Sequence, residues 1–115
     1  MTRFGTNIKL NVPATLREKT QAFYQQGMGA THKSPRESLD MFIFEDGFCL
    51  GIFYNEETLT PEQLKLGPWL EVSTPDPDAL ALKLVDHGGT AVKGMTPHHY
   101  VAAPGGLVWR LEKTA

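Results

Sequence analysis

Residues of the kinds that bind small molecules recur at alternate positions of the predicted strands. Arg110 carries a planar guanidinium, which suits a carboxylate or phosphate group, and Trp69 and Phe53 supply aromatic surface to cover the apolar part of a ligand. Successive side chains of a strand point to opposite faces, so the apolar set is expected to meet the helices and the polar set to line a cup. The predicted ligand-binding set is Arg110, Trp69, Phe53, Asn7, Glu71, Lys9 and His99.

The charged residues of this face have an alternative role. Lys9, Glu71, Arg110 and Glu112 carry opposite charges and can pair with one another across the sheet. Such cross-strand pairs are common and stabilise a sheet by about 0.2–1 kcal/mol each. The sequence leaves both roles open: an anion-binding face or a set of structural ion pairs.

Two adjacent histidines, His98 and His99, point to opposite faces of one strand, so a regular strand cannot bring both to one metal ion. Either could face the cup as a general base, because imidazole titrates near neutrality, but a lone strand histidine is more often a solvated surface residue. We include His99 in the ligand-binding set and assign no catalytic residue. Cys49 has no activating base in view and is expected to be a small buried side chain.

Hydrophobic periodicity predicts the elements that hold these residues. Two helices are expected, over about 16–26 and between Asp76-Pro77 and Gly88-Gly89, with a third, short one after Thr60. The expected strands cover residues 6–12, 38–45, 48–54, 69–72, 90–93, 98–103 and 107–111, and residues 31–37 form a polar stretch.

Local motifs predict where these elements begin and end. Thr15 and Glu18 have the spacing of a capping box, and Gly27 and Gly29 are expected to end the first helix. Asp46-Gly47 joins two β-rich runs and suits a type I′ turn.

The two halves of the chain repeat one order of elements. Leu10 and Leu70, like Gly29 and Gly89, lie sixty residues apart, and strand, helix, glycine stop and strands recur at that interval. We therefore predict an α+β fold of two βαβββ modules forming a curved mixed sheet. The single domain covers residues 1–115, with modules at about 4–55 and 68–113 and a linker at 56–67.

This arrangement resembles the vicinal oxygen chelate superfamily, which includes glyoxalase I, bleomycin-resistance proteins and extradiol dioxygenases. The resemblance rests on residues 8–13 as the opening strand, on 22–24 with 27–29 closing the first helix, on 72–84 opening the second module, and on the turn at 103–107. It covers essentially the full chain. An ordinary ferredoxin-like α+β domain is the competing interpretation.

The resemblance implies metal ligands on the first, fourth, fifth and eighth strands. These positions fall at Asn7, near Gly51, near Gly67 and at Arg110, none of which is a usual ligand, and a guanidinium has no lone pair to give. We therefore predict no metal and no cofactor, and a small-molecule-binding protein of unknown ligand. The alternatives are a metal-dependent lyase or dioxygenase with atypical ligands, and a partner-binding module.

Composition limits the partners. The 115 residues carry a net charge of −2, without the basic excess that nucleic-acid binding needs. No apolar run is long enough to span a bilayer, and the first ten residues do not resemble a secretory signal. We expect a cytoplasmic protein without nucleic-acid or membrane partners, and the resemblance implies a homodimer whose site lies within one chain or between two.

Overall fold

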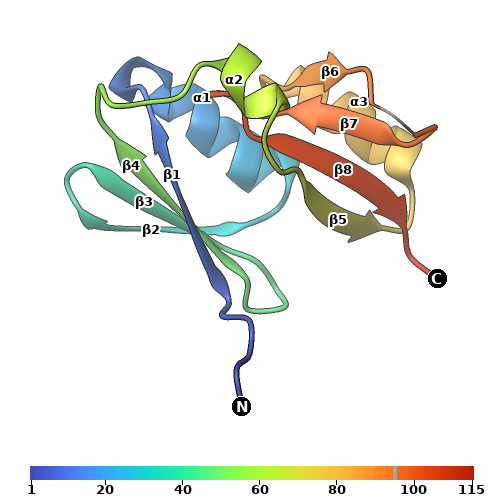
Figure 1. The fold of residues 1–115 in the computed structure, drawn as a ribbon, viewed down its shortest axis with the longest axis horizontal. Helices are drawn as coiled ribbons and strands as arrows, with labels where there is room; N and C mark the ends of the chain where they lie inside the picture. The colour runs from blue at the N-terminus through green and yellow to red at the C-terminus, as the bar shows by residue number, and fades with distance from the viewer. Residues whose placement is uncertain (95) are drawn as a thin grey trace.

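Each half of the chain folds into a four-stranded mixed sheet with the same strand order. The computed structural model describes residues 1–94 and 96–115, and Figure 1 shows its elements. In chain order these are β1 (Asn7–Val12), η1 (Ala14–Leu16), α1 (Arg17–Gln21), η2 (Ala22–Gly27), β2 (Thr31–Arg36), β3 (Leu39–Ile43), β4 (Cys49–Tyr54), α2 (Pro61–Lys65), β5 (Leu70–Thr74), α3 (Pro77–Asp86), β6 (Thr90–Val92), β7 (His99–Ala102) and β8 (Val108–Lys113).

The strand orders are β1-β4-β3-β2 and β5-β8-β7-β6. In each sheet the first strand pairs in parallel with the last, and the other pairs are antiparallel. This topology confirms the predicted α+β class and the repeated βαβββ order. No helix in the described part of the chain combines the length and hydrophobicity needed to cross a membrane.

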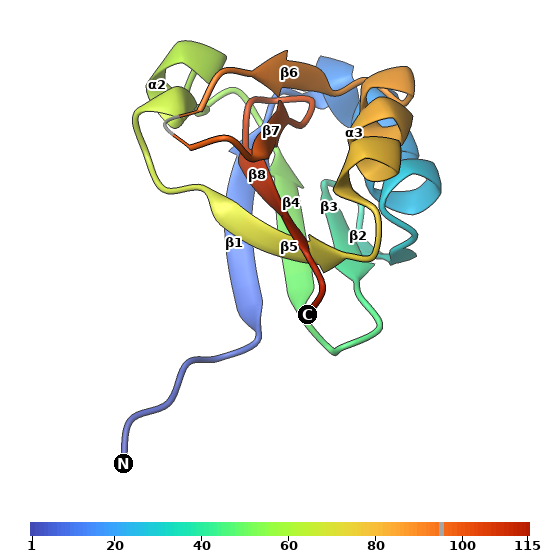
Figure 2. The same cartoon turned by 90° about the vertical axis from the view of Figure 1, so that its right-hand side faces the viewer.

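One hydrophobic core joins the two modules. The inward faces of β4 and β8 meet in it, through Leu50 and Ile52 on one sheet and Trp109 and Leu111 on the other. The first helical segment and α3 lie on one side, where α3 contacts η2, and α2 lies away from them (Figure 2). Because both apolar faces turn toward this core, the alternate residues of each sheet face away from it.

The first helical segment differs from its prediction at both ends. The predicted capping box of Thr15 and Glu18 is wrong: the segment starts as the short 3₁₀ turn η1 after Pro13, with no side-chain cap. Its last part, η2, is a π-helix. Gly29 (φ 77°) follows it as the predicted left-handed residue, whereas Gly27 lies inside η2, where an added Cβ would come 3.0 Å from Leu84 Cδ2.

The β3–β4 hairpin is confirmed, but its predicted type I′ turn is wrong. Gly47 has φ 91° and no non-glycine residue in the described chain has a positive φ, so Asp46 does not adopt the conformation that a type I′ turn requires. Instead, Phe44 N–H donates to Phe48 O and Gly47 N–H donates to Phe44 O, which makes a three-residue loop. The Asp46 carboxylate accepts the Phe48 N–H at 3.0 Å, and this local bond favours the longer loop.

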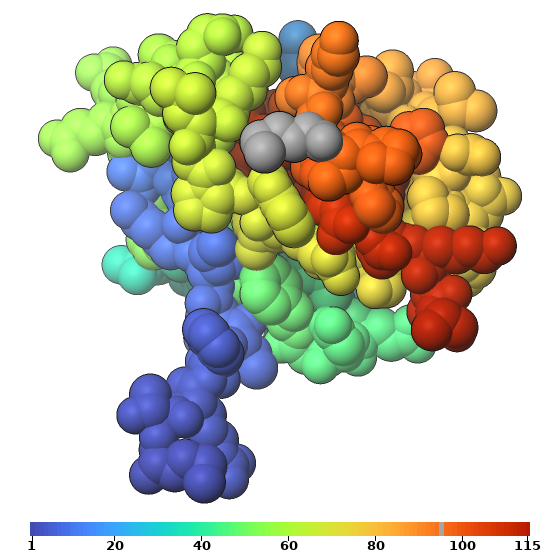
Figure 3. All heavy atoms as spheres, turned by 45° about the vertical axis from the view of Figure 1, so that its right-hand side comes forward, coloured from blue at the N-terminus to red at the C-terminus, as the bar shows by residue number. Residues whose placement is uncertain are grey.

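The polar stretch at 31–37 contains an edge strand. Thr31 to Arg36 form β2, which pairs with β3 alone and has a register shift between Lys33 and Arg36. Edge strands with such irregularities tolerate proline, so Pro35 is accommodated. The first residues of the chain extend away from the body (Figure 3). The side chain of Phe4 is fully exposed.

Two predicted helix starts are confirmed in the second half. Thr60 forms a reciprocal capping box with Gln63 at the start of α2, and Pro61 occupies the first helical position. The Asp76 carboxylate accepts the Ala79 N–H at 3.1 Å and caps α3.

Candidate functional site

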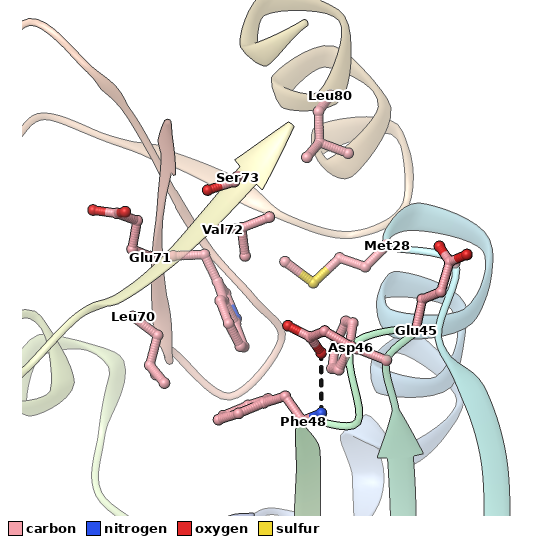
Figure 4. Close-up of a pocket in the computed structure, with 12 residues that line it drawn as sticks. Met28, Glu45, Asp46, Phe48, Leu70, Glu71, Val72, Ser73 and Leu80 are labelled. Atoms are coloured by element: carbon pink, nitrogen blue, oxygen red, sulfur yellow. Dashed lines mark hydrogen bonds between the residues drawn. The ribbon is translucent and has the colours of Figure 1, made fainter. Parts of the chain in front are cut away.

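An open cleft of about 470 Å³ lies between the two modules. The β3–β4 hairpin forms one wall, and β5, β8 and the start of α3 form the other (Figure 4). Its lining residues are Met28, Gly29, Phe44, Glu45, Asp46, Phe48, Leu70, Glu71, Val72, Ser73, Leu80 and Trp109. Of these, only Glu71 was in the set predicted from sequence.

Three aromatic rings form a continuous wall of the cleft. The centroid of Phe44 lies 6.2 Å from that of Phe48 and 6.4 Å from that of Trp109. Trp109 Nε1 donates to the hydroxyl of Tyr24 at 3.1 Å, which fixes the plane of the indole. Burial raises the pKa of Tyr24 well above its ordinary value, against a smaller opposing effect of the Trp109 bond, so this hydroxyl stays neutral.

The opening of the cleft carries carboxylates. Glu45 and Asp46 are exposed, and Figure 4 shows the Asp46 carboxylate turned into the opening between Phe48 and Met28. Glu71 also borders the cleft, but its Oε2 lies 2.6 Å from Arg110 Nη1. Asp46 also accepts the Phe48 N–H, but no basic side chain in the described part of the chain pairs with Glu45 or Asp46, so their negative charge stays available to a ligand.

The π-helix brings Met28 to this cleft. Met28 N–H donates to Phe23 O, five residues earlier, and the left-handed Gly29 then turns the chain away into β2. A π-turn inserts one more residue than an α-turn, and such turns recur at functional sites.

The predicted residues of the second module lie together on the outward face of their sheet. Arg110 Nη2 lies 2.9 Å from Glu112 Oε2, in addition to the bond of Nη1 with Glu71, and the guanidinium carbon is 5.2 Å from the Trp69 ring centroid. Two carboxylates of the chain itself thus balance the charge of Arg110. This is the structural pairing that the sequence left open as an alternative to anion binding.

His98, and not His99, lies beside Arg110. Tyr100 pairs with Arg110 and His99 with Leu111, so even-numbered residues of this segment share the Arg110 face. His98 Nε2 lies 3.0 Å from Arg110 Nη2, whereas His99 Nε2 lies 2.6 Å from Asp78 of α3. The placement of His99 in the cup was wrong.

The predicted residues of the first module lie on the other sheet. Lys9 Nζ is 5.7 Å from the Phe53 ring centroid, Arg36 covers the same ring at 5.9 Å, and Asn7 is exposed two residues from Lys9. These residues and the Arg110 group occupy the outward faces of two different sheets. One chain therefore presents two separate surfaces where the sequence predicted one cup.

The positions that the resemblance implied for a metal do not form a metal site. Gly51 lies in β4 and Gly67 follows α2, so neither offers a side-chain ligand, and Arg110 contributes a cation in place of a lone pair. In residues 1–94 and 96–115, no three His, Cys, Asp or Glu side chains are arranged to hold an ion. This donor set does not fit the superfamily's metal.

A buried ionic network was missed by the sequence analysis. Asp40 is fully buried and accepts hydrogen bonds of 2.8–2.9 Å from Arg17, Gln21, His32 and Tyr54. Burial alone would raise the pKa of Asp40, but the bonds from Arg17, His32, Gln21 and Tyr54 outweigh it and hold that pKa well below its usual range. One signal in the sequence could have indicated this network: Asp40 is a lone carboxylate on the buried face of a predicted strand, and a buried carboxylate requires hydrogen-bonding partners.

No protein-family model matches the sequence, and no curated protein is significantly similar to it. Solved structures share its fold at low identity. A glyoxalase-related enzyme from Fulvimarina pelagi is 19% identical, with a TM-score of 0.73 over 98% of this chain and 89% of that one. A glyoxalase/bleomycin resistance protein from Albidiferax ferrireducens is 16% identical, with a TM-score of 0.68 over 96% and 98%. An antibiotic-binding protein from a Streptomyces species is 18% identical, with a TM-score of 0.67 over 99% and 98%.

Proposed function

We propose that this chain, whose fold is that of the glyoxalase/bleomycin-resistance proteins, binds a small organic molecule in the cleft between its modules and does so without a metal. The observation that carries the proposal is the cleft itself. Its volume of about 470 Å³ lies within the range of small-molecule sites, roughly 300–1,000 Å³, and apolar and aromatic side chains with a few polar groups line it. The structures that share this fold include both an antibiotic-binding protein and a glyoxalase-related enzyme, so the proposal rests on the cleft.

Filling the cleft is expected to weaken binding. Leu80 lines it from α3, so Leu80→Trp places an indole in the ligand's volume, and we expect the affinity to fall at least about tenfold, which corresponds to 1.4 kcal/mol. The measurement is the ligand-induced rise in Tm, which reports selective binding to the folded state. A panel of aryl-alkyl amines, alcohols and carboxylates supplies the ligands.

The matched control lies on the same helix. Leu82 is 71% exposed and does not line the cleft, so Leu82→Trp adds the same side chain elsewhere and is expected to bind like the wild type. Equal binding by both variants would place the ligand elsewhere, and the absence of any stabilising compound in the panel would contradict the proposal.

We also propose that a homodimer assembles the predicted cup. The Lys9–Phe53 surface and the Arg110–Trp69 surface lie on different sheets of one chain, so they can form one site only if two copies oppose them. Trp69 is 46% exposed, which leaves aromatic area for such a contact.

Charge at this surface is expected to separate the copies. Trp69→Asp introduces a desolvation cost at the proposed interface, so we expect a particle of one 12.7 kDa chain where the wild type gives two. Analytical ultracentrifugation measures this, with Leu82→Asp on α3 as the control that stays dimeric. A wild-type protein that is monomeric at high micromolar concentration would refute the dimer.

A further inference from the structure

The cleft combines two features that each recognise positive charge. Three aromatic rings, those of Phe44, Phe48 and Trp109, form one wall, and the Glu45 and Asp46 carboxylates stand at the opening. The described lining residues include no lysine, arginine or histidine. The negative charge at this opening is therefore local, although the whole chain carries only −2.

We infer that the cleft selects organic cations: an ammonium group bound at the opening, joined to an apolar body that enters between the modules. This inference rests on the proposed function and names its ligand class. Aromatic faces attract a cation through the ring quadrupole, most strongly where the site is partly desolvated. The Asp46 carboxylate, turned into the opening, adds a direct charge interaction (Figure 4).

The other charge classes gain less from the same surface. A carboxylate or phosphate would approach Glu45 and Asp46 without a basic lining residue to offset the repulsion. A neutral compound would bury the same apolar area against Val72, Leu80 and the rings, but would gain neither the carboxylates nor the cation–π contact. The apolar walls thus supply affinity for all three classes, and the opening discriminates between them.

Three probes with one apolar body separate these contributions. They are 4-phenylbutylammonium, 4-phenyl-1-butanol and 5-phenylpentanoate, which share the phenylbutyl group and carry a small cationic, neutral or anionic head. Isothermal titration calorimetry of the full chain with each probe gives three dissociation constants. We expect the cation to bind about tenfold more tightly than the alcohol, and the carboxylate more weakly than either. This advantage should shrink as ionic strength rises.

Variants assign the preference to the opening. In the double variant Glu45→Gln/Asp46→Asn, we expect the cation to bind only about twofold more tightly than the alcohol, because the aromatic rings alone then favour the cation. The affinity for the alcohol is expected to stay unchanged. Asn at position 46 keeps the acceptor for the Phe48 N–H and so preserves the loop. Glu56→Gln/Glu57→Gln is the matched control, because it removes two exposed carboxylates that do not line the cleft.

The outcomes are distinguishable. If the alcohol binds and the cation binds no better, or if the control weakens the cation as much as the double variant, the cation inference is overturned and the binding function stands. If none of the three probes binds, the proposed function and the inference both fail. A cation preference that is lost only in the Glu45/Asp46 double variant supports both.

Discussion

Replacing Asp40 with alanine is expected to lower the free energy of unfolding by about 3–5 kcal/mol, a large part of the stability of a domain this size. The four donors that surround Asp40 keep their positions in the fold but lose their shared acceptor. The hydroxyl of Tyr54 and the amide of Gln21 are then left partly buried without it, and each unsatisfied group costs about 1–3 kcal/mol.

The measurement is urea unfolding at neutral pH. Glu18→Ala is the matched control, because Glu18 is an exposed carboxylate on the helix that carries Arg17, and we expect it to change stability by no more than about 0.5 kcal/mol. A loss below 1 kcal/mol in Asp40→Ala would show that the network contributes little to folding.

The same carboxylate makes stability depend on pH. Folding lowers the pKa of Asp40, so its contribution is complete above the unfolded value, about 3.9, and is lost as pH falls below it toward the folded value. Wild-type stability should therefore decline between about pH 5 and pH 2 more steeply than that of Asp40→Asn. Equal slopes would contradict this assignment.

Gly89→Ala is expected to destabilise the protein by about 1–3 kcal/mol or more through overpacking. An added Cβ at Gly89 would lie 2.8 Å from Leu84 O, from the ring of Phe23 and from Val101 Cγ1. The first of these is backbone and the other two belong to buried side chains, so none can move away cheaply.

Gly51→Ala provides the comparison, since both changes add one methyl group. Neighbours of a Cβ at Gly51 lie at 3.7–4.0 Å, which is ordinary contact, so we expect no loss of stability there. Thermal unfolding of the two variants measures the difference as a gap in Tm. Similar Tm values would contradict the steric explanation.

The sequence predicted features that depend on neighbouring residues. Asp76 before Pro77 set the start of α3, and alternation set the inward faces of β1 and β8. The sequence did not predict features that depend on contacts between residues far apart in the chain. Nothing near Gly27 indicates that Leu84, fifty-seven residues later, lies against it.

The candidate site also has one part that depends on neighbouring residues and one that depends on distant contacts. The three-residue loop at 104–106 sets Tyr100 opposite Arg110, and this register places His98, and not His99, on the Arg110 face. The cleft could not be predicted, because its walls come from segments whose relative placement depends on how the modules pack. Parity gives the face of a sheet that a residue occupies and does not give what opposes that face.

The repeated strand order also governs how the protein reaches this structure. In each sheet the last strand lies between the first and the third, so among the described strands β5 gains a partner only when β8 forms, and Glu71 pairs with Arg110 across 39 residues. Closing such a loop costs chain entropy before any hydrogen bond of the parallel pair forms. Folding should therefore be limited by these two closures, which places the chain with the slower folders of its size.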